Sequence, residues 1–193
     1  MEALSTIDSD LFLFLNGLHT AWMDKVMVLI TEMWVWIPLY ILLFYWTVRQ
    51  YGKRFWWILL ALGLVMLCSD QLASHVFKPL FHRLRPCYNI DFQDLIHLPD
   101  GLAGGRYGFV SSHAANTFAI AAFLTPALRN YRPWPAIVLY LWAFLSSYSR
   151  IYIGYHYPGD ILCGALLGIL IGLIFWKIFQ IVQRKIGKSE QRV

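Results

Sequence analysis

Runs of apolar residues long enough to cross a lipid bilayer are the feature of this sequence that most constrains its fold. A helix needs about 20 such residues to span the hydrocarbon core. The clearest runs cover residues 26–48, 55–77 and 161–182. Two shorter runs, 111–128 and 134–149, reach span length with polar residues from their flanks. We therefore predict an all-α, polytopic transmembrane helix bundle with five spans.

The composition agrees with a chain embedded in lipid. Apolar residues make up 59% and charged residues 14%, against roughly 45–50% and about 25% in soluble domains. These values exclude a disordered chain and a water-soluble enzyme with a charged shell. The basic residues do not form a stripe, so nucleic acid is not a predicted partner. Residues 11–15 are too few to span and predict a short N-terminal interfacial helix.

The loops give the predicted orientation. Lys and Arg lie between spans one and two, between spans three and four, and after span five. The positive-inside rule makes that side cytoplasmic, so loops 78–110 and 150–160 face outward. The outward loops nevertheless carry five basic residues against this rule, and those residues need another reason to be there: Lys78, Arg83, Arg85, Arg106 and Arg150.

Two further features concern the spans themselves. Gly164, Gly168 and Gly172 recur every four residues, which predicts close helix packing through a face of small residues. Glu32 and Asp70 are carboxylates inside apolar runs, where charged groups are costly enough to be functional candidates. Each of the two could instead lie near an interface or bond to a neighbouring helix.

Three polar clusters fall in the predicted outward region. They are Lys78 to Arg85-Pro86, then Ser111-Ser112-His113, then Ser149-Arg150 to His156 and Asp160. Their three cations suit a phosphoryl group, and Arg offers bidentate contacts to its oxygens. The two serines open a helix, where free N–H groups bind anions.

The two histidines of these clusters allow a division of labour. His156 and Asp160 are four residues apart, so a helical turn would let the carboxylate hold one ring nitrogen. His156 is therefore the better nucleophile, and His113 is the better general acid. Each cluster alone also fits a plainer role: a solvated membrane anchor, a helix N-cap, or an interfacial salt bridge. All three on one face favour a single anion site.

These clusters resemble the motifs of the type-2 phosphatidic acid phosphatases, also called lipid phosphate phosphatases. The family pattern is Lys-x6-Arg-Pro, Pro-Ser-Gly-His and Ser-Arg-x5-His-x3-Asp. The first and third motifs are complete, and the second has Val110 and Ser112 in place of the family's Pro and Gly. The motifs run from about residue 78 to residue 160, and the surrounding spans also fit the family.

The resemblance implies one integral-membrane phosphatase domain over residues 1–193 that works without a metal or cofactor. The outward loops also lack a convincing His/carboxylate ligand set. His156 would attack phosphorus to give a phosphohistidine, Asp160 would orient it, and His113 would protonate the leaving group. Phosphate-binding residues would be Lys78, Arg85, Ser111, Ser112 and Arg150.

The resemblance also implies a membrane lipid phosphate as substrate and a bacterial cytoplasmic (inner) membrane location with a periplasmic site. Among the candidate substrates we rank isoprenyl (undecaprenyl) diphosphate first, phosphatidic acid or phosphatidylglycerol phosphate second, and lipid A third. Two other classes stay open. Vanadium-dependent haloperoxidases share the family's anion site, although five apolar spans argue against an oxidative enzyme. A non-catalytic lipid-binding or transport protein is favoured by the altered Val110–Ser112 stretch alone.

Overall fold

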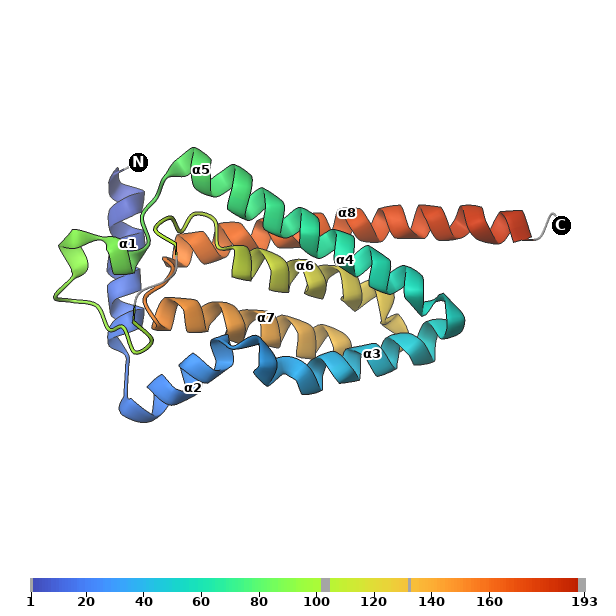
Figure 1. The fold of residues 1–193 in the computed structure, drawn as a ribbon, viewed down its shortest axis with the longest axis horizontal. Coiled ribbons are helices and arrows are strands. Elements are labelled where there is room, and N and C mark those ends of the chain that lie inside the picture. Colours follow the sequence, from blue (N-terminus) through green and yellow to red (C-terminus); the bar gives the residue numbers. More distant parts are fainter. Residues whose placement is uncertain (1, 102–104, 132, 191–193) are drawn as a thin grey trace.

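The computed structural model of the protein describes residues 2–101, 105–131 and 133–190, and no named strand occurs among them (Figure 1). The predicted all-α fold is confirmed. Residues 102–104 of the predicted 78–110 loop lie outside the described residues. The helices are α1 (Glu2–Gly17), α2 (Ala21–Thr31), α3 (Ile37–Tyr51), α4 (Phe55–Gln71), α5 (Lys78–Phe81), α6 (Ser112–Ala127), α7 (Trp134–Tyr152) and α8 (Pro158–Glu190).

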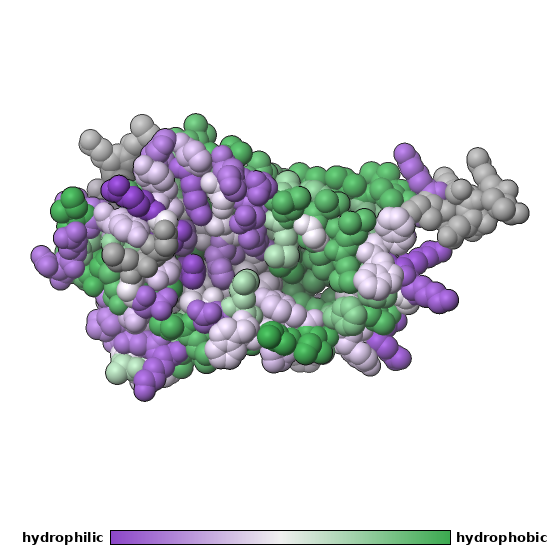
Figure 2. Space-filling view, in the orientation of Figure 1, coloured by the Kyte–Doolittle hydropathy of each residue, from purple (hydrophilic) through white to green (hydrophobic). Residues whose placement is uncertain are grey.

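Two helical stretches, Met33–Phe81 and Pro158–Lys185, are long and apolar enough to cross a membrane. The first stretch contains α3 and α4, which run in opposite directions and are joined by the short 3₁₀ turn Gly52–Arg54. Figure 2 shows apolar side chains over the middle of the molecule and hydrophilic side chains gathered toward its two ends. The count of five spans stays a prediction.

The predicted run 26–48 is not one helix. α2 ends at Thr31, Glu32 has an extended backbone (φ −79°, ψ 130°), and α3 begins at Ile37 after a 3₁₀ turn. Pro38 lies in the first turn of α3, where its missing N–H costs no helical hydrogen bond. Uniform hydropathy hides this break, because apolar residues continue across it. α1 is also longer than the predicted 11–15 run.

α6 is the central helix, and most of its side chains are buried against α4, α7 and α8. Its contact with α8 depends on the predicted small-residue face, because a Cβ at Gly164 or Gly168 would collide with the α6 backbone. This close approach brings the beginnings of the two helices together. The Ser111 N–H donates to the Asp160 carbonyl oxygen at 3.1 Å.

α1 lies across the end of the bundle at which α6 and α8 begin (Figure 1). Asn16, near its C-terminal end, is buried and donates to the carbonyl oxygens of Tyr152 at 2.7 Å and His97 at 3.0 Å. Its side-chain oxygen accepts from the His97 N–H at 2.7 Å. One buried amide therefore ties α1 to the long loop and to the end of α7.

Candidate active site

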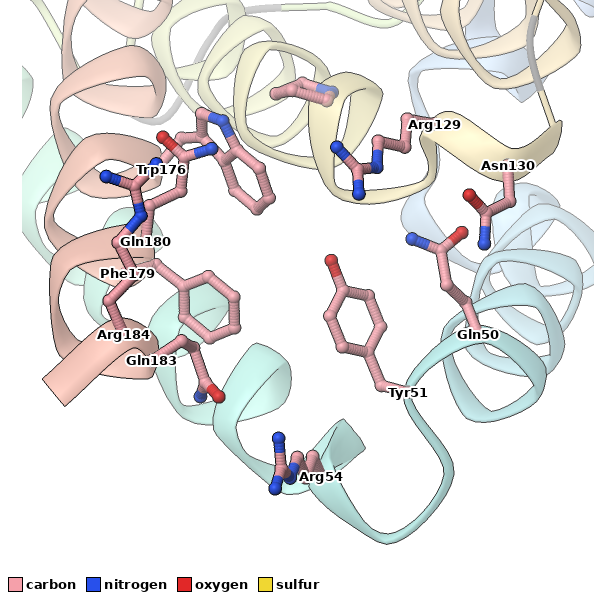
Figure 3. A pocket seen from close by; sticks show the side chains of 11 residues that line it. Gln50, Tyr51, Arg54, Arg129, Asn130, Trp176, Phe179, Gln180, Gln183 and Arg184 are labelled. Atoms are coloured by element: carbon pink, nitrogen blue, oxygen red, sulfur yellow. The ribbon is translucent and has the colours of Figure 1, made fainter. Parts of the chain in front are cut away.

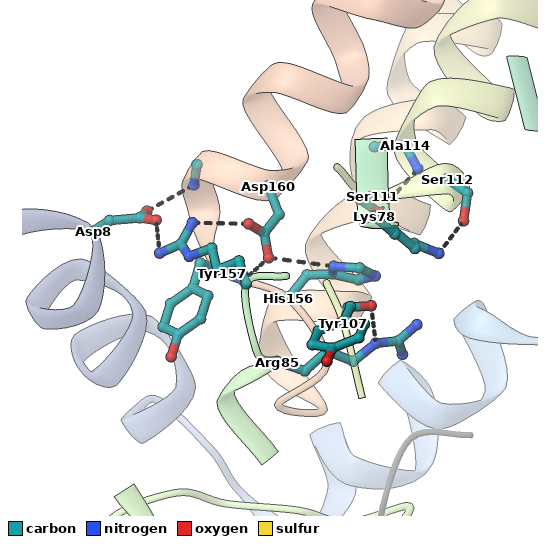
Figure 4. A network of polar contacts seen from close by, with 12 residues as sticks. Asp8, Lys78, Arg85, Tyr107, Ser111, Ser112, Ala114, His156, Tyr157 and Asp160 are labelled. Carbon is teal, nitrogen blue, oxygen red and sulfur yellow. Dashed lines mark hydrogen bonds and ion pairs between the residues drawn. The ribbon is translucent and has the colours of Figure 1, made fainter. Parts of the chain in front are cut away.

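The structure brings the three predicted polar clusters together at one end of the bundle. α6 and α8 begin at this end, α7 finishes there, and the α4–α5 segment reaches it from the other side of α6 (Figures 1 and 4). All eight predicted site residues belong to these helix ends and their loops: Lys78, Arg85, Ser111, Ser112, His113, Arg150, His156 and Asp160.

His156 and Asp160 form the centre of the arrangement, and both are buried. The His156 Nδ1 atom lies 3.5 Å from Asp160 Oδ2, within ion-pair reach but longer than an ordinary hydrogen bond. The predicted helical turn between them is not formed, because His156 precedes α8 and only Asp160 is helical. Asp160 Oδ2 accepts from the Tyr157 N–H at 3.1 Å instead, which curls the loop around the carboxylate.

Burial lowers the pKa of His156 from 6.5 to about 4. Asp160 opposes this shift, whereas the charges of Arg85 and Arg150 add to it. The imidazole is therefore neutral at physiological pH. With Nδ1 facing the carboxylate, Nε2 is the nitrogen available to attack an electrophile.

Arg83 and Asp8 support the same carboxylate, although neither was a predicted site residue. The Arg83 guanidinium donates to Asp160 Oδ1 at 2.8 Å and to Asp8 Oδ2 at 2.7 Å, and lies 4.0 Å from the centre of the Tyr157 ring. Burial works to lower the pKa of Arg83, but the two carboxylates outweigh it and the pKa is raised. Asp8 also accepts from the Gly159 N–H at 2.7 Å, so α1 contacts the start of α8.

Gly108 lets the long loop approach the His156–Asp160 pair closely. A Cβ at this position would lie 2.9 Å from Asp160 Oδ2 and 3.5 Å from His156 Nδ1. Antiparallel pairing of the loop's two arms holds it there. The Arg85 N–H donates to the Arg106 carbonyl at 2.9 Å, and the Gly108 N–H donates to the Arg83 carbonyl at 2.8 Å.

The start of α6 provides an anion-binding cradle beside this pair. Ser111 is the N-cap, and its buried hydroxyl accepts from the Ala114 N–H at 3.3 Å. Ser112 and His113 follow in the first turn, where N–H groups and the helix dipole favour a negative charge. Lys78 donates to the Ser112 hydroxyl at 3.0 Å, so the non-family serine binds the predicted phosphate-binding lysine.

His113 is oriented by a neighbouring helix. Its Nε2 atom lies 2.7 Å from the Ser146 hydroxyl on α7. This hydrogen bond leaves Nδ1 as the nitrogen that can exchange a proton with a bound group. The two histidines come from different helix ends: His113 from the first turn of α6, and His156 from the loop before α8.

Arg150 is the third predicted phosphate-binding cation, after Lys78 and Arg85. Its Nη1 donates to the Thr31 hydroxyl at 2.6 Å, and its guanidinium carbon lies 5.1 Å from the centre of the Tyr155 ring. The loop after it turns sharply, with the Tyr155 and His156 N–H groups both donating to the Arg150 carbonyl. Gly154 permits this turn with φ 79°, a left-handed conformation that glycine adopts without strain.

The remaining polar residues of interest take no direct part in the candidate active site. Asp70 accepts from Asn116 on α6 at 3.5 Å, whereas Glu32 is exposed at the break after α2. His97, in the long loop, bonds to Asp24 at 2.8 Å and stacks on the His19 ring. Within the part of the chain that is described, no group of three or more metal-ligating side chains occurs.

Sequence reasoning missed several supporting residues. Arg83 had a signal, because it is one of the basic residues that oppose the positive-inside trend. Asp8, Thr31 and Ser146 had none, since each is an ordinary polar residue that meets its partner only through the fold. Gly108 could not be distinguished from the other loop glycines.

Comparison with known proteins identifies the family of this chain. Residues 54–184 match the PAP2 superfamily. The chain is 38% identical to the lipid A 4′-phosphatase of Bacteroides thetaiotaomicron over 92% of its own length and 79% of that protein. It is 28% identical to the undecaprenyl-diphosphatase BcrC of Bacillus subtilis over 90% of its length and 85% of that protein.

The fold is also found in solved structures. The crystal structure of Aquifex aeolicus LpxE superposes with a TM-score of 0.64 and 27% identity, covering 87% of this chain and 93% of that one. The family match covers well over half of the chain, and its relatives are membrane enzymes that act on lipid phosphates. The protein is therefore a member of the PAP2 superfamily and a lipid phosphate hydrolase.

Proposed function

We propose that this protein hydrolyses a phosphate group on a membrane lipid in two steps, without a metal ion. The observation that carries the mechanism is the buried His156 held beside Asp160, within electrostatic reach of Arg85 and Arg150. In the first step, His156 Nε2 attacks phosphorus, and the bond from phosphorus to the leaving oxygen breaks. His113 gives its proton to that oxygen.

In the second step, a water molecule attacks the phosphohistidine. Neutral His113 takes a proton from this water, the P–N bond breaks, and inorganic phosphate leaves with His156 regenerated. Lys78, Arg85 and Arg150 stabilise the charge on the equatorial oxygens in both steps, together with Ser111 and the Ser112 N–H. These fixed cations supply the charge neutralisation that a metal ion provides in other phosphatases.

For the substrate we propose a phosphorylated amphiphile of the lipid A type. The 38% identity to a lipid A 4′-phosphatase supports this choice. We therefore rank it ahead of isoprenyl diphosphate, which the sequence alone put first. Isoprenyl diphosphate stays the second candidate, supported by the similarity to an undecaprenyl-diphosphatase. An apolar cavity of about 630 Å³ between α3, α4 and α6 has room for a segment of the hydrocarbon part of either lipid.

We also propose that the site faces the periplasmic side of a bacterial cytoplasmic membrane. The support is the distribution of basic residues, because the turn after α3, the α6–α7 connection and the chain from Lys177 onward carry most of those without a site role. The polar loops around His156 are at the opposite end of the bundle.

The test is phosphate release by the purified protein in detergent with EDTA present. Lipid A, an isoprenyl diphosphate, phosphatidic acid and phosphatidylglycerol phosphate are each offered to the wild type, to His156→Ala and to His75→Ala. His75 is an exposed histidine outside the site and serves as the matched control. We expect metal-independent release that is lost in His156→Ala alone. Release that requires added metal, or that survives in His156→Ala, would overturn the mechanism.

A further inference from the structure

A second cavity lies at the end of the bundle opposite the candidate active site, with a volume of about 440 Å³ (Figure 3). Its walls come from the end of α3 and the following turn, from the end of α6, and from the second half of α8. α6 has 16 residues, so at about 1.5 Å per residue its two ends are about 24 Å apart. This cavity is therefore not part of the active site.

Three arginines from three separate segments line this cavity: Arg54, Arg129 and Arg184. None of the described residues that line it is acidic. The charges of Arg129 and Arg184 on the walls of one cavity repel each other unless an anion lies between them. Guanidinium groups bind phosphate oxygens in bidentate geometry, which makes phosphate the best-matched anion.

The end of α6 does not account for Arg129 and Arg184. The Ala127 carbonyl oxygen, at the negative end of the helix dipole, accepts from the Tyr51 hydroxyl at 2.8 Å and from the Gln50 side-chain amide. Neutral groups therefore satisfy this oxygen. Two amide atoms in the cavity wall, Gln50 Oε1 and Gln183 Nε2, have no hydrogen-bond partner among the described residues.

An apolar groove borders the cavity at Phe179. Trp176 and Phe179 form the apolar wall of the cavity, and Phe179 also lines the groove, of about 170 Å³, between α4 and α8. The remaining groove residues are all apolar, among them Leu60, Leu64 and Val182. A cationic cavity beside an apolar groove matches a molecule with a phosphate head and a hydrocarbon chain.

We propose that this site binds an anionic glycerophospholipid of the surrounding bilayer. Its phosphate lies between Arg129 and Arg184, and one acyl chain lies in the α4–α8 groove. Basic pockets between membrane helices bind lipid head groups in this manner. The bound lipid bridges α3, α6 and α8, so it stabilises the bundle at the end remote from catalysis.

The test measures the Tm of the purified protein in neutral detergent with added lipid. Phosphatidylglycerol is compared with zwitterionic phosphatidylcholine, and with glycerophosphoglycerol and inorganic phosphate, which have no acyl chain. The site variant is Arg129→Gln with Arg184→Gln. The matched control is Arg49→Gln with Lys53→Gln, which removes the same charge from the same end without touching the cavity lining.

We expect phosphatidylglycerol to raise the Tm of the wild type and the control by about 5 °C at a concentration near 100 times Kd. The site variant should lose this rise, and phosphatidylcholine should not produce it. An equal loss in the control would show non-specific surface attraction and overturn the proposal. An equal rise with inorganic phosphate or glycerophosphoglycerol would show a simple anion site and overturn the lipid assignment.

Native mass spectrometry of the wild type provides a second measurement that depends on no variant. The protein is released from mixed micelles of phosphatidylglycerol and phosphatidylcholine, and the retained lipids are counted. The proposal expects one phosphatidylglycerol per chain that resists exchange. Equal retention of the two lipids, or retention of neither, would contradict it even where the arginine variant does not fold.

Discussion

Arg83 holds Asp160 on the side away from His156. Its guanidinium donates to Asp160 Oδ1 at 2.8 Å, while the other carboxylate oxygen faces His156 Nδ1 at 3.5 Å. Asp8 fixes the far side of Arg83 at 2.7 Å. The order Asp8, Arg83, Asp160, His156 therefore links the N-terminal helix to the proposed nucleophile, with Asp160 in contact with both neighbours (Figure 4).

Replacing Arg83 should slow the reaction without weakening substrate binding. In Arg83→Gln the Asp160 carboxylate loses its charged donor and its fixed orientation, so the imidazole is held less well. Loss of such a supporting contact costs about tenfold to 100-fold in activity. We expect kcat to fall by that factor with KM nearly unchanged, and Arg83→Lys to recover part of it.

Asp8→Asn is the companion variant, because it loosens Arg83 but leaves the bond to Asp160. A smaller loss in kcat is expected there. Wild-type kcat in Arg83→Gln, with an unchanged Tm, would show that the ion pair only fastens the loop to α1.

The lowered pKa of His156 predicts a nucleophile that stays neutral in mild acid. An ordinary histidine gains its proton near pH 6.5, whereas His156 gains it near pH 4 because burial disfavours the cation. Between these values the unfolded chain binds the extra proton and the folded chain does not. The folded state therefore loses stability as the pH falls from about 6.5 to about 4.

The measurement is the NMR titration of the protein with labelled histidine rings, in which His156 is identified as the resonance missing from His156→Ala. A midpoint near pH 4 is expected. A midpoint near pH 6.5 would mean that the imidazole is solvated in the free enzyme.

Ser112 gives a prediction that concerns the departure from the family motif. Its hydroxyl accepts from Lys78 at 3.0 Å, a bond that the family's glycine could not form. A charge-assisted hydrogen bond is worth about 1.5–3 kcal/mol, so it competes with phosphate for the lysine. We expect both Ser112→Ala and Ser112→Gly to lower KM severalfold. Improvement in Ser112→Gly alone would point to backbone freedom, and a raised KM in both would mean that Ser112 itself helps to bind phosphate.

The sequence predicted the presence of the helices better than the residues at which they begin and end. Apolar runs mark where chain must be buried in lipid or protein, but residues 26–48 stay apolar across the break at Glu32. Hydropathy reports only how apolar a residue is, so it cannot reveal that the backbone changes direction at Glu32. α1 was predicted too short because its first half is polar, and its position depends on Asn16, which bonds to carbonyl groups more than 80 residues away.

The candidate site divides in the same way. Residues with chemistry of their own, such as His156 and Arg150, were found because their types and spacing are unusual at a membrane boundary. Residues that only hold a catalytic or phosphate-binding side chain in place were not found from the sequence. Ser146 meets His113 across 33 positions, and Asp8 meets Arg83 across 75, so only the folded chain pairs them.

Arg150→Lys should reduce activity strongly although the charge is kept. The guanidinium uses one nitrogen to bond Thr31 and lies against the Tyr155 ring, which leaves its remaining donors aimed in a fixed direction. An ammonium group has neither the fork nor the planar face. We expect kcat/KM to fall about 100-fold, as for loss of a donor to a developing charge. Thr31→Val should cost less, and wild-type rates in Arg150→Lys would mean that Arg150 only anchors α7.

Gly108→Ala tests how tightly the long loop packs on the pair of His156 and Asp160. The new methyl group would lie 2.9 Å from Asp160 Oδ2 and 3.5 Å from His156 Nδ1, and Arg85 Cγ at 3.2 Å blocks its escape. The carboxylate or the loop must move, and either shift misplaces the imidazole. Because a displacement of about 1 Å can cost 100-fold in rate, we expect kcat to fall at least that far. Gly105→Ala, in the same loop, has its nearest neighbour at 3.9 Å and should keep full activity. Equal rates for the two variants would show that the loop yields without disturbing the pair.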